Sequence, residues 1–162
     1  MSVCEIIPNL WLGNILIAKS NTFFIENNIN VVINCSKNIP FYHNHTKNYR
    51  IAVDDNLKEI EIDKFYDYLP KIIPILHNHL LNNDRVLVHC YAGKQRSAAI
   101  ICCYLLTYGD MDLKKCVESI KTKRLVSFTP GINFLKATSS LPIAASTSFS
   151  LSSPNKPSLN VW

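Results

Sequence analysis

"VLVHCYAGKQRSAAIICCYLL", residues Val86–Leu106, joins an apolar strand pattern to an apolar helical pattern through a short polar loop. The strand pattern ends at Cys90, and Arg96 stands six residues later, where the helical pattern begins. A loop between a strand end and a helix N-terminus turns backbone N–H groups inward, and together with the helix dipole these groups form a site for an anion. The stretch therefore predicts a strand, an anion-binding loop and a helix in direct succession.

The residues of this loop suit chemistry on a phosphate group. Cys90 lies at the rim of the expected anion site, and the field that holds an anion also favours the nucleophilic thiolate form of a cysteine. Gly93 allows the backbone to turn where a side chain would obstruct it. The planar guanidinium of Arg96 can bind two phosphate oxygens at once. The spacing therefore predicts attack by sulfur on phosphorus, with a phosphocysteine intermediate.

Strand and helix patterns alternate along the rest of the chain. Strand patterns cover residues 6–12, with a turn at Pro8–Asn9, then 30–35, 49–53 and 85–90. Helical patterns cover residues 21–28, capped by Ser20, then 63–81, 97–108, 112–123 and about 131–137. Pro70 and Pro74 predict a kinked or two-piece helix within 63–81. The alternation predicts an α/β fold with a central, mostly parallel sheet of four or five strands flanked by helices.

Length and composition restrict the possible functions. A chain of 162 residues suits one domain, and the net charge of +5 without a Lys/Arg run favours anionic substrates but does not indicate nucleic acid. The N-terminus lacks a signal-peptide pattern, and no apolar run reaches the length of about 18 residues that a membrane span needs. Six cysteines in such a chain predict free thiols in a reducing compartment, the cytoplasm, with the nucleus as an alternative. Nothing in the sequence predicts an oligomeric state.

The composition changes at Thr138. Eight of the last 25 residues are serine, three are proline, and Lys156 is the one charged residue among them. Such a segment buries little apolar surface, so we expect a disordered tail over residues 138–162 and a folded domain over residues 1–137.

The opening stretch resembles a known enzyme signature. "VHCYAGKQRS" is similar to the HCxxGxxRS motif of the cysteine-based protein phosphatases, and "IIPNLWLGN", "INVVINCS" and "YRIAVDDN" resemble segments of the small, atypical dual-specificity phosphatases. The resemblance covers about residues 4–137. It implies the cysteine-phosphatase fold and hydrolysis of phosphotyrosine and phosphoserine/threonine in phosphorylated proteins. The implied chemistry needs no metal or cofactor, and we predict no metal site at the two His-Asn-His triplets.

The resemblance also implies roles for individual residues. Cys90 is expected to be the nucleophile and Arg96 the phosphate clamp. His89 is expected to orient the loop and activate the thiol, and Ser97 to hydrogen-bond the thiolate and help it leave. The expected phosphate-binding loop consists of Tyr91, Ala92, Gly93, Lys94, Gln95 and Arg96.

The leaving oxygen needs a proton, so the site needs a general acid. Asp54 and Asp55 stand side by side after the strand pattern of residues 49–53. Alignment with the family pattern favours Asp55 and leaves Asp54 as the alternative. The same carboxylate would then activate the water that hydrolyses the phosphocysteine.

Three features depart from the family pattern or extend it. Lys94 resembles the loop of phosphoinositide phosphatases, so a phosphoinositide or an RNA 5′-phosphate is an alternative substrate, and a phospho-binding module without turnover is a further alternative. Leu125 stands where the family has a proline, and the loop-bracing role of a family asparagine does not transfer to Asn133. Cys35 ends the strand pattern of residues 30–35, and by resemblance it is a candidate for a reversible disulfide with Cys90.

Overall fold

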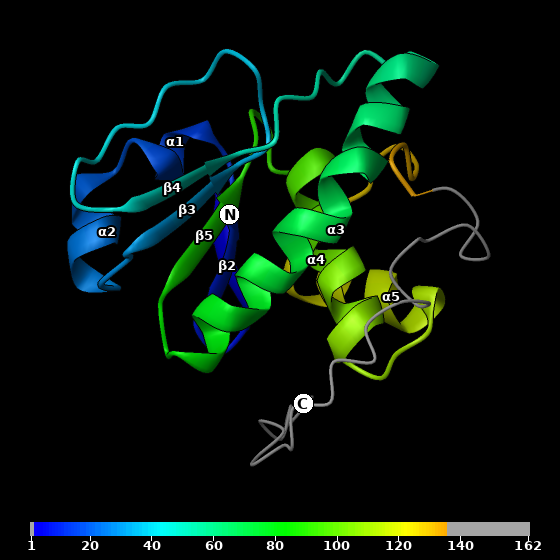
Figure 1. Ribbon diagram of the computed structural model, residues 1–162. Coiled ribbons are helices and arrows are strands. Elements are labelled where there is room, and N and C mark those ends of the chain that lie inside the picture. The colour runs from blue at the N-terminus through cyan, green and yellow to red at the C-terminus, as the bar shows by residue number, and fades with distance from the viewer. Residues whose placement is uncertain (1, 136–162) are drawn as a thin grey trace.

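The computed structural model describes residues 2–135, which form a five-stranded sheet with helices on both faces (Figure 1). The strand order is β1-β2-β5-β3-β4, with β1 antiparallel to β2 and all other neighbours parallel. The strands are β1 (Val3–Ile7), β2 (Leu10–Gly13), β3 (Val31–Asn34), β4 (Lys47–Arg50) and β5 (Val86–His89). The expected fold class is therefore confirmed.

The helices form two layers around this sheet (Figure 1). Two short helices, α1 (Ile15–Ala18) and α2 (Asn21–Glu26), cover one face. The other face is covered by α3 (Glu59–Leu81), α4 (Arg96–Tyr108) and α5 (Leu113–Lys123). Ser20 caps α2 through a hydrogen bond from the Phe23 N–H, as the sequence predicts.

Alternating side chains of the central strands supply both halves of the core. In β5, Val86 and Val88 pack with the α3 and α4 side chains, whereas Leu87 packs with Trp11 and Phe24 on the opposite face. Successive strand residues point to opposite faces, and here both faces are covered. This is why β5 is a continuous apolar run rather than an alternating one.

The N-terminal segment forms a hairpin rather than one short strand over residues 6–12. β1 starts at Val3 and pairs with β2 across the turn at Pro8–Asn9, where Asn9 has a φ of 68°. The turn is confirmed, but the strand before it is longer than the apolar pattern indicates because the edge strand is only partly buried.

The strand expected over residues 49–53 ends earlier, at Arg50. Its partner β3 ends at Asn34, whose carbonyl accepts one last bond from the Ile51 N–H at 2.9 Å. The Val53 N–H then bonds back to the Ile51 carbonyl, so the chain turns away from the sheet.

The helix expected over residues 63–81 starts earlier and is a single piece. α3 runs from Glu59 to Leu81 with Pro70 and Pro74 inside it. An interior proline costs about 3 kcal/mol, whereas full burial of an apolar side chain contributes about 1.5–3 kcal/mol. The buried apolar face of α3 outweighs two prolines; it consists of Phe65, Leu69, Ile72, Ile73 and Leu76.

The helix expected at about 131–137 is absent from residues 131–135, and its last two positions lie outside the described residues. The Gln95 side chain instead donates to the carbonyls of Thr129 and Gly131 and accepts from the Asn133 N–H. These backbone groups are therefore satisfied without a helix. The serine-rich tail also lies outside the described residues.

Candidate active site

The loop of residues 90–95 connects the carboxyl end of β5 to the first residue of α4, as the sequence predicts. β3 runs parallel beside β5, with Asn34 opposite His89. The Cys35 N–H donates to the His89 carbonyl at 2.7 Å, which continues this register by one residue. The structure therefore brings Cys35 and Cys90 to neighbouring strand ends at one edge of the sheet.

Cys90 is fully buried, and its sulfur has two close polar neighbours. The Gly93 N–H donates to Sγ at 3.2 Å, and the Ser97 hydroxyl lies 3.2 Å from Sγ. Gly93 has a φ of +66°, and a Cβ there would lie 2.5 Å from the carbonyl oxygen of Gly13. Glycine is therefore required for the turn that directs this N–H at the sulfur.

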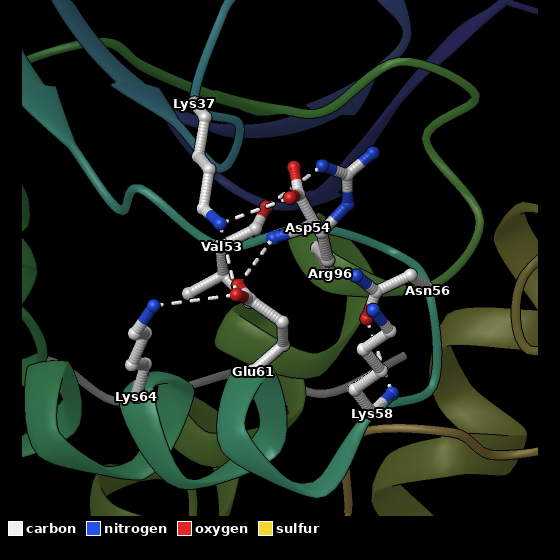
Figure 2. A network of polar contacts seen from close by, with 8 residues as sticks. All are labelled: Lys37, Val53, Asp54, Asn56, Lys58, Glu61, Lys64 and Arg96. Atoms are coloured by element: carbon white, nitrogen blue, oxygen red, sulfur yellow. Dashed lines mark hydrogen bonds and ion pairs between the residues drawn. The ribbon is translucent and has the colours of Figure 1, made fainter.

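Arg96 is buried at the N-terminus of α4, with only 7% of the residue exposed. Its Nη1 donates to the Val53 carbonyl at 2.9 Å (Figure 2). Its buried Nε has no hydrogen-bond partner among residues 2–135. Burying a charge with an unsatisfied donor is costly unless a ligand pairs with it. The arrangement suits an anion that binds over the loop.

His89 is buried behind the loop, and its environment keeps the imidazole neutral. Burial lowers the pKa of His89 to about 4, with smaller effects from the Cys90 backbone and from the Arg50 and Arg96 charges. The Nδ1 atom has no hydrogen-bond partner among the described residues. At neutral pH, the expected effect of His89 on the thiol must therefore come from loop geometry rather than from a full positive charge.

The two candidate acids differ in their surroundings. The Asp54 carboxylate forms an ion pair with Lys37, at 2.9 Å between Oδ2 and Nζ (Figure 2). Asp55 is exposed at the start of the loop that leads to α3. A general acid must carry a proton to give away. An oxygen that already accepts from a lysine is poorly placed for that, so the geometry favours Asp55.

Two buried side chains, Arg124 from outside the loop and Gln95 from within it, join the loop to neighbouring segments. Arg124, the C-cap of α5, donates from Nε to the Gly93 carbonyl at 3.0 Å and from Nη2 to the Ala92 carbonyl at 3.2 Å. Gln95 binds the backbone of residues 129–133, and the Phe128 N–H donates to the Lys94 carbonyl at 2.7 Å. Neither contact is predicted from the sequence. The local pattern around Arg124 shows only a basic helix end, and the contacts span about thirty positions of the chain.

The remaining expected residues fall into two groups. Tyr91, Ala92 and Lys94 are exposed on the loop, while Cys35 is fully buried. Burial, followed by the nearby Cys90, raises the pKa of the Cys35 thiol well above its usual value.

Within residues 2–135, no three His, Cys, Asp or Glu side chains gather in a way that would hold a metal ion. The same residues include no helix with the length and apolar character needed to cross a bilayer.

Comparison with known proteins identifies the family of this chain. The family described as "Dual specificity phosphatase, catalytic domain" matches residues 10–140. The chain belongs to the dual-specificity phosphatase family. This membership confirms the family and the enzyme class expected from the sequence, a dual-specificity protein phosphatase.

Relatives of this family differ widely in length. The viral protein 123R of Invertebrate iridescent virus 6, whose name places it among tyrosine phosphatases, is 32% identical over 139 residues, or 84% of this chain and 89% of that protein. Human dual specificity protein phosphatase 16 is 32% identical over 133 residues, or 81% of this chain. The chain spans only 19% of that human protein.

Solved structures share the fold. Human DUSP28 superposes with a TM-score of 0.71 at 22% identity, over 78% of this chain and 84% of that chain. DUSP15 superposes with a TM-score of 0.70 at 26% identity, over 77% and 78% of the two chains. The five-stranded sheet and its helices are therefore those of a dual-specificity phosphatase.

Proposed function

We propose that this chain hydrolyses phosphotyrosine and phosphoserine/threonine in proteins through a phosphocysteine intermediate, with residues 1–137 as the catalytic domain. The observation that carries the proposal is Arg96, a buried guanidinium whose Nε has no partner among the described residues. Arg96 is the first residue of α4 and follows directly on the loop that begins at the buried Cys90. A phosphate would pair with this charge and accept hydrogen bonds from N–H groups at the start of α4.

In the first step, the Cys90 thiolate attacks phosphorus. The sulfur–phosphorus bond forms as the bond from phosphorus to the substrate oxygen breaks, and Asp55 gives its proton to that oxygen. The Gly93 N–H and the Ser97 hydroxyl, each 3.2 Å from Sγ, hold the sulfur in place for attack. Arg96 offsets the charge that builds on the phosphoryl oxygens.

In the second step, the Asp55 carboxylate takes a proton from water as that water attacks phosphorus. The sulfur–phosphorus bond breaks, and inorganic phosphate leaves. The Ser97 hydroxyl is close enough to donate a hydrogen bond to the departing thiolate. This hydrogen bond stabilises the leaving sulfur. Release of phosphate then leaves Cys90 as a thiolate and Asp55 protonated, as before the first step.

Hydrolysis of p-nitrophenyl phosphate in the presence of a chelator tests the chemistry. We expect turnover that Cys90→Ser abolishes and Arg96→Ala lowers by at least about a hundredfold. Cys116→Ser is the matched control, because Cys116 is an equally buried thiol in α5, away from the loop. Full turnover in Cys90→Ser would contradict the mechanism. Phosphate binding without any turnover of the wild type would favour a phospho-binding module.

A substrate panel tests the choice of substrate. Lys94 is exposed on the loop, where it adds positive charge for any phosphate ester. We expect phosphopeptides to be hydrolysed faster than phosphoinositide vesicles or 5′-phosphorylated RNA. Markedly faster hydrolysis of the lipid or the RNA would overturn the protein substrate and leave the chemistry in place.

A further inference from the structure

Glu61 is a buried carboxylate that the proposed chemistry does not use. It lies in the first turn of α3, and its side chain is only 6% exposed. Its Oε2 accepts the Asp54 N–H at 2.9 Å, while its Oε1 accepts from Lys37 at 2.8 Å and from Lys64 at 3.3 Å (Figure 2). Carboxylates are seldom buried this deeply unless they are paired, so these contacts account for its position.

These contacts keep Glu61 ionised. The Asp54 N–H, followed by Lys37, lowers the pKa of Glu61 to about 2. Glu61 is therefore a fixed negative charge at the pH of any plausible reaction. It therefore cannot act as a proton donor. Its Oε2 binds the backbone directly before Asp55, and its Oε1 binds the two lysines.

The two residues before Asp55 are held from three sides. Glu61 of α3 holds the Asp54 N–H, and Lys37 joins the Asp54 carboxylate to that of Glu61. Arg96 of α4 holds the Val53 carbonyl at 2.9 Å. The peptide that leads into Asp55 is thereby fixed relative to the guanidinium expected to bind phosphate.

The segment after Asp55 is exposed and has local turn geometry. Leu57 has a φ of 61°, and the Lys58 N–H donates to the Asn56 side chain at 3.1 Å. The chain then enters α3 at Glu59. Since Glu61 lies on the first turn of α3 and binds Asp54, it closes the short loop of residues 55–58, the acid loop, which carries Asp55.

We propose that Glu61 is a positioning residue that directs Asp55 toward the leaving oxygen by fixing the backbone of Asp54. This inference rests on the proposed function, because it assumes that Asp55 is the general acid. Glu61 does not touch the substrate; it acts through the acid loop. Its loss should therefore weaken proton donation while leaving phosphate binding by Arg96 intact.

Leaving-group dependence distinguishes this role from general structural support. A basic leaving oxygen needs a proton, whereas an acidic phenol leaves with little help. We expect Glu61→Gln to lower kcat/KM by about tenfold for phenyl phosphate, a part of the roughly 10²–10⁴ that general acid catalysis supplies. For difluoromethylumbelliferyl phosphate we expect a loss below about threefold. The matched control is Glu59→Gln, an exposed acid in the same helical turn, which should leave both rates unchanged.

A double-mutant cycle completes the test. In an Asp55→Asn background, Glu61→Gln should have little further effect, because the acid that it positions is gone. Equal losses on both substrates, or the same loss in both backgrounds, would overturn the proposal. If Glu61→Gln does not fold, Lys37→Met should show the same leaving-group selectivity. A Lys37→Met variant without that selectivity would equally overturn the proposal. Failure of the proposed function is separately visible as wild-type turnover that persists in Cys90→Ser.

Discussion

Two neighbouring aspartates follow β4, and the structure separates them by what each already binds. Asp54 contacts Lys37 through its side chain and Glu61 through its backbone. Asp55 is exposed and follows directly on this fixed peptide. We therefore propose that Asp54 holds the loop and that Asp55 acts as the general acid.

Single substitutions of the two aspartates test this division. Asp55→Asn should lower kcat/KM for phenyl phosphate by about a hundredfold, because the general acid is removed. Asp54→Asn keeps the backbone hydrogen bond to Glu61 and removes only a partly exposed ion pair. Its kcat/KM for phenyl phosphate should therefore fall by less than about tenfold. The reverse ranking in steady-state assays would assign the acid to Asp54.

Cys35, which lies beside the end of β5, is a candidate disulfide partner for an oxidised Cys90. Adjacent strands lie about 5 Å apart, which is within the range of Cα separations of about 4.4–6.8 Å that disulfides span. Peroxide would convert the Cys90 thiolate to a sulfenic acid, and attack by the Cys35 sulfur would form the disulfide and release water.

We therefore predict a Cys35–Cys90 disulfide after mild peroxide treatment. Peptide mass spectrometry under non-reducing conditions should find the linked peptide, and dithiothreitol should restore activity. In Cys35→Ser, recovery should fall because Cys90 is left to oxidise further. Oxidised wild-type protein without the linked peptide would refute the prediction.

At the scale of elements, the opening stretch of sequence predicted the strand, loop and helix that carry Cys90 and Arg96. This was possible because all three follow one another in the chain and each has its own local signal. The supporting contacts had no such signal. Arg124 reaches Gly93 across about thirty positions, and Glu61 binds backward across the acid loop.

Helix α3 is continuous where the two prolines predict a kinked or two-piece helix. Pro70 and Pro74 are exposed on the outer side of the helix, while its inner side is packed against the core. Burial of the inner side retains a single helix despite two missing backbone donors. Tertiary packing therefore overrides a local preference here.

Replacing one of these prolines measures what the helix tolerates. Pro70→Ala restores a backbone donor and removes a ring clash, which stabilises the folded state. It also raises the conformational entropy of the unfolded chain, which offsets part of this gain. We expect a net gain of about 1–2 kcal/mol in the free energy of unfolding, measured with urea. A loss of stability would show that the proline ring itself packs favourably.

For the whole molecule, the buried neutral His89 links stability to pH. Burial lowers its pKa from 6.5 to about 4, so between these values the unfolded chain binds more protons than the folded one. The contribution is fully present above pH 6.5 and is lost as pH falls toward 4. Since one pKa unit corresponds to about 1.4 kcal/mol, the loss is about 3 kcal/mol.

Urea unfolding at several pH values checks this linkage. The free energy of unfolding should fall between pH 6.5 and pH 4 in the wild type, and His89→Asn should have a shallower slope there, whatever its absolute stability. Glu61 has a lowered pKa and contributes in a separate window, with stability lost as pH falls from 4.5 to about 2. Equal slopes for wild type and His89→Asn would contradict a buried neutral imidazole.

Finding the residue that receives the phosphoryl group is the sharpest test of the phosphocysteine intermediate. Asp55→Asn, which should hydrolyse the intermediate slowly, is mixed with a radiolabelled phosphopeptide, quenched rapidly under denaturing conditions and digested. The phosphocysteine mechanism predicts label on the peptide that contains Cys90 and none in Cys90→Ser. Label on a different residue, or turnover with no labelled protein at any time point, would contradict it.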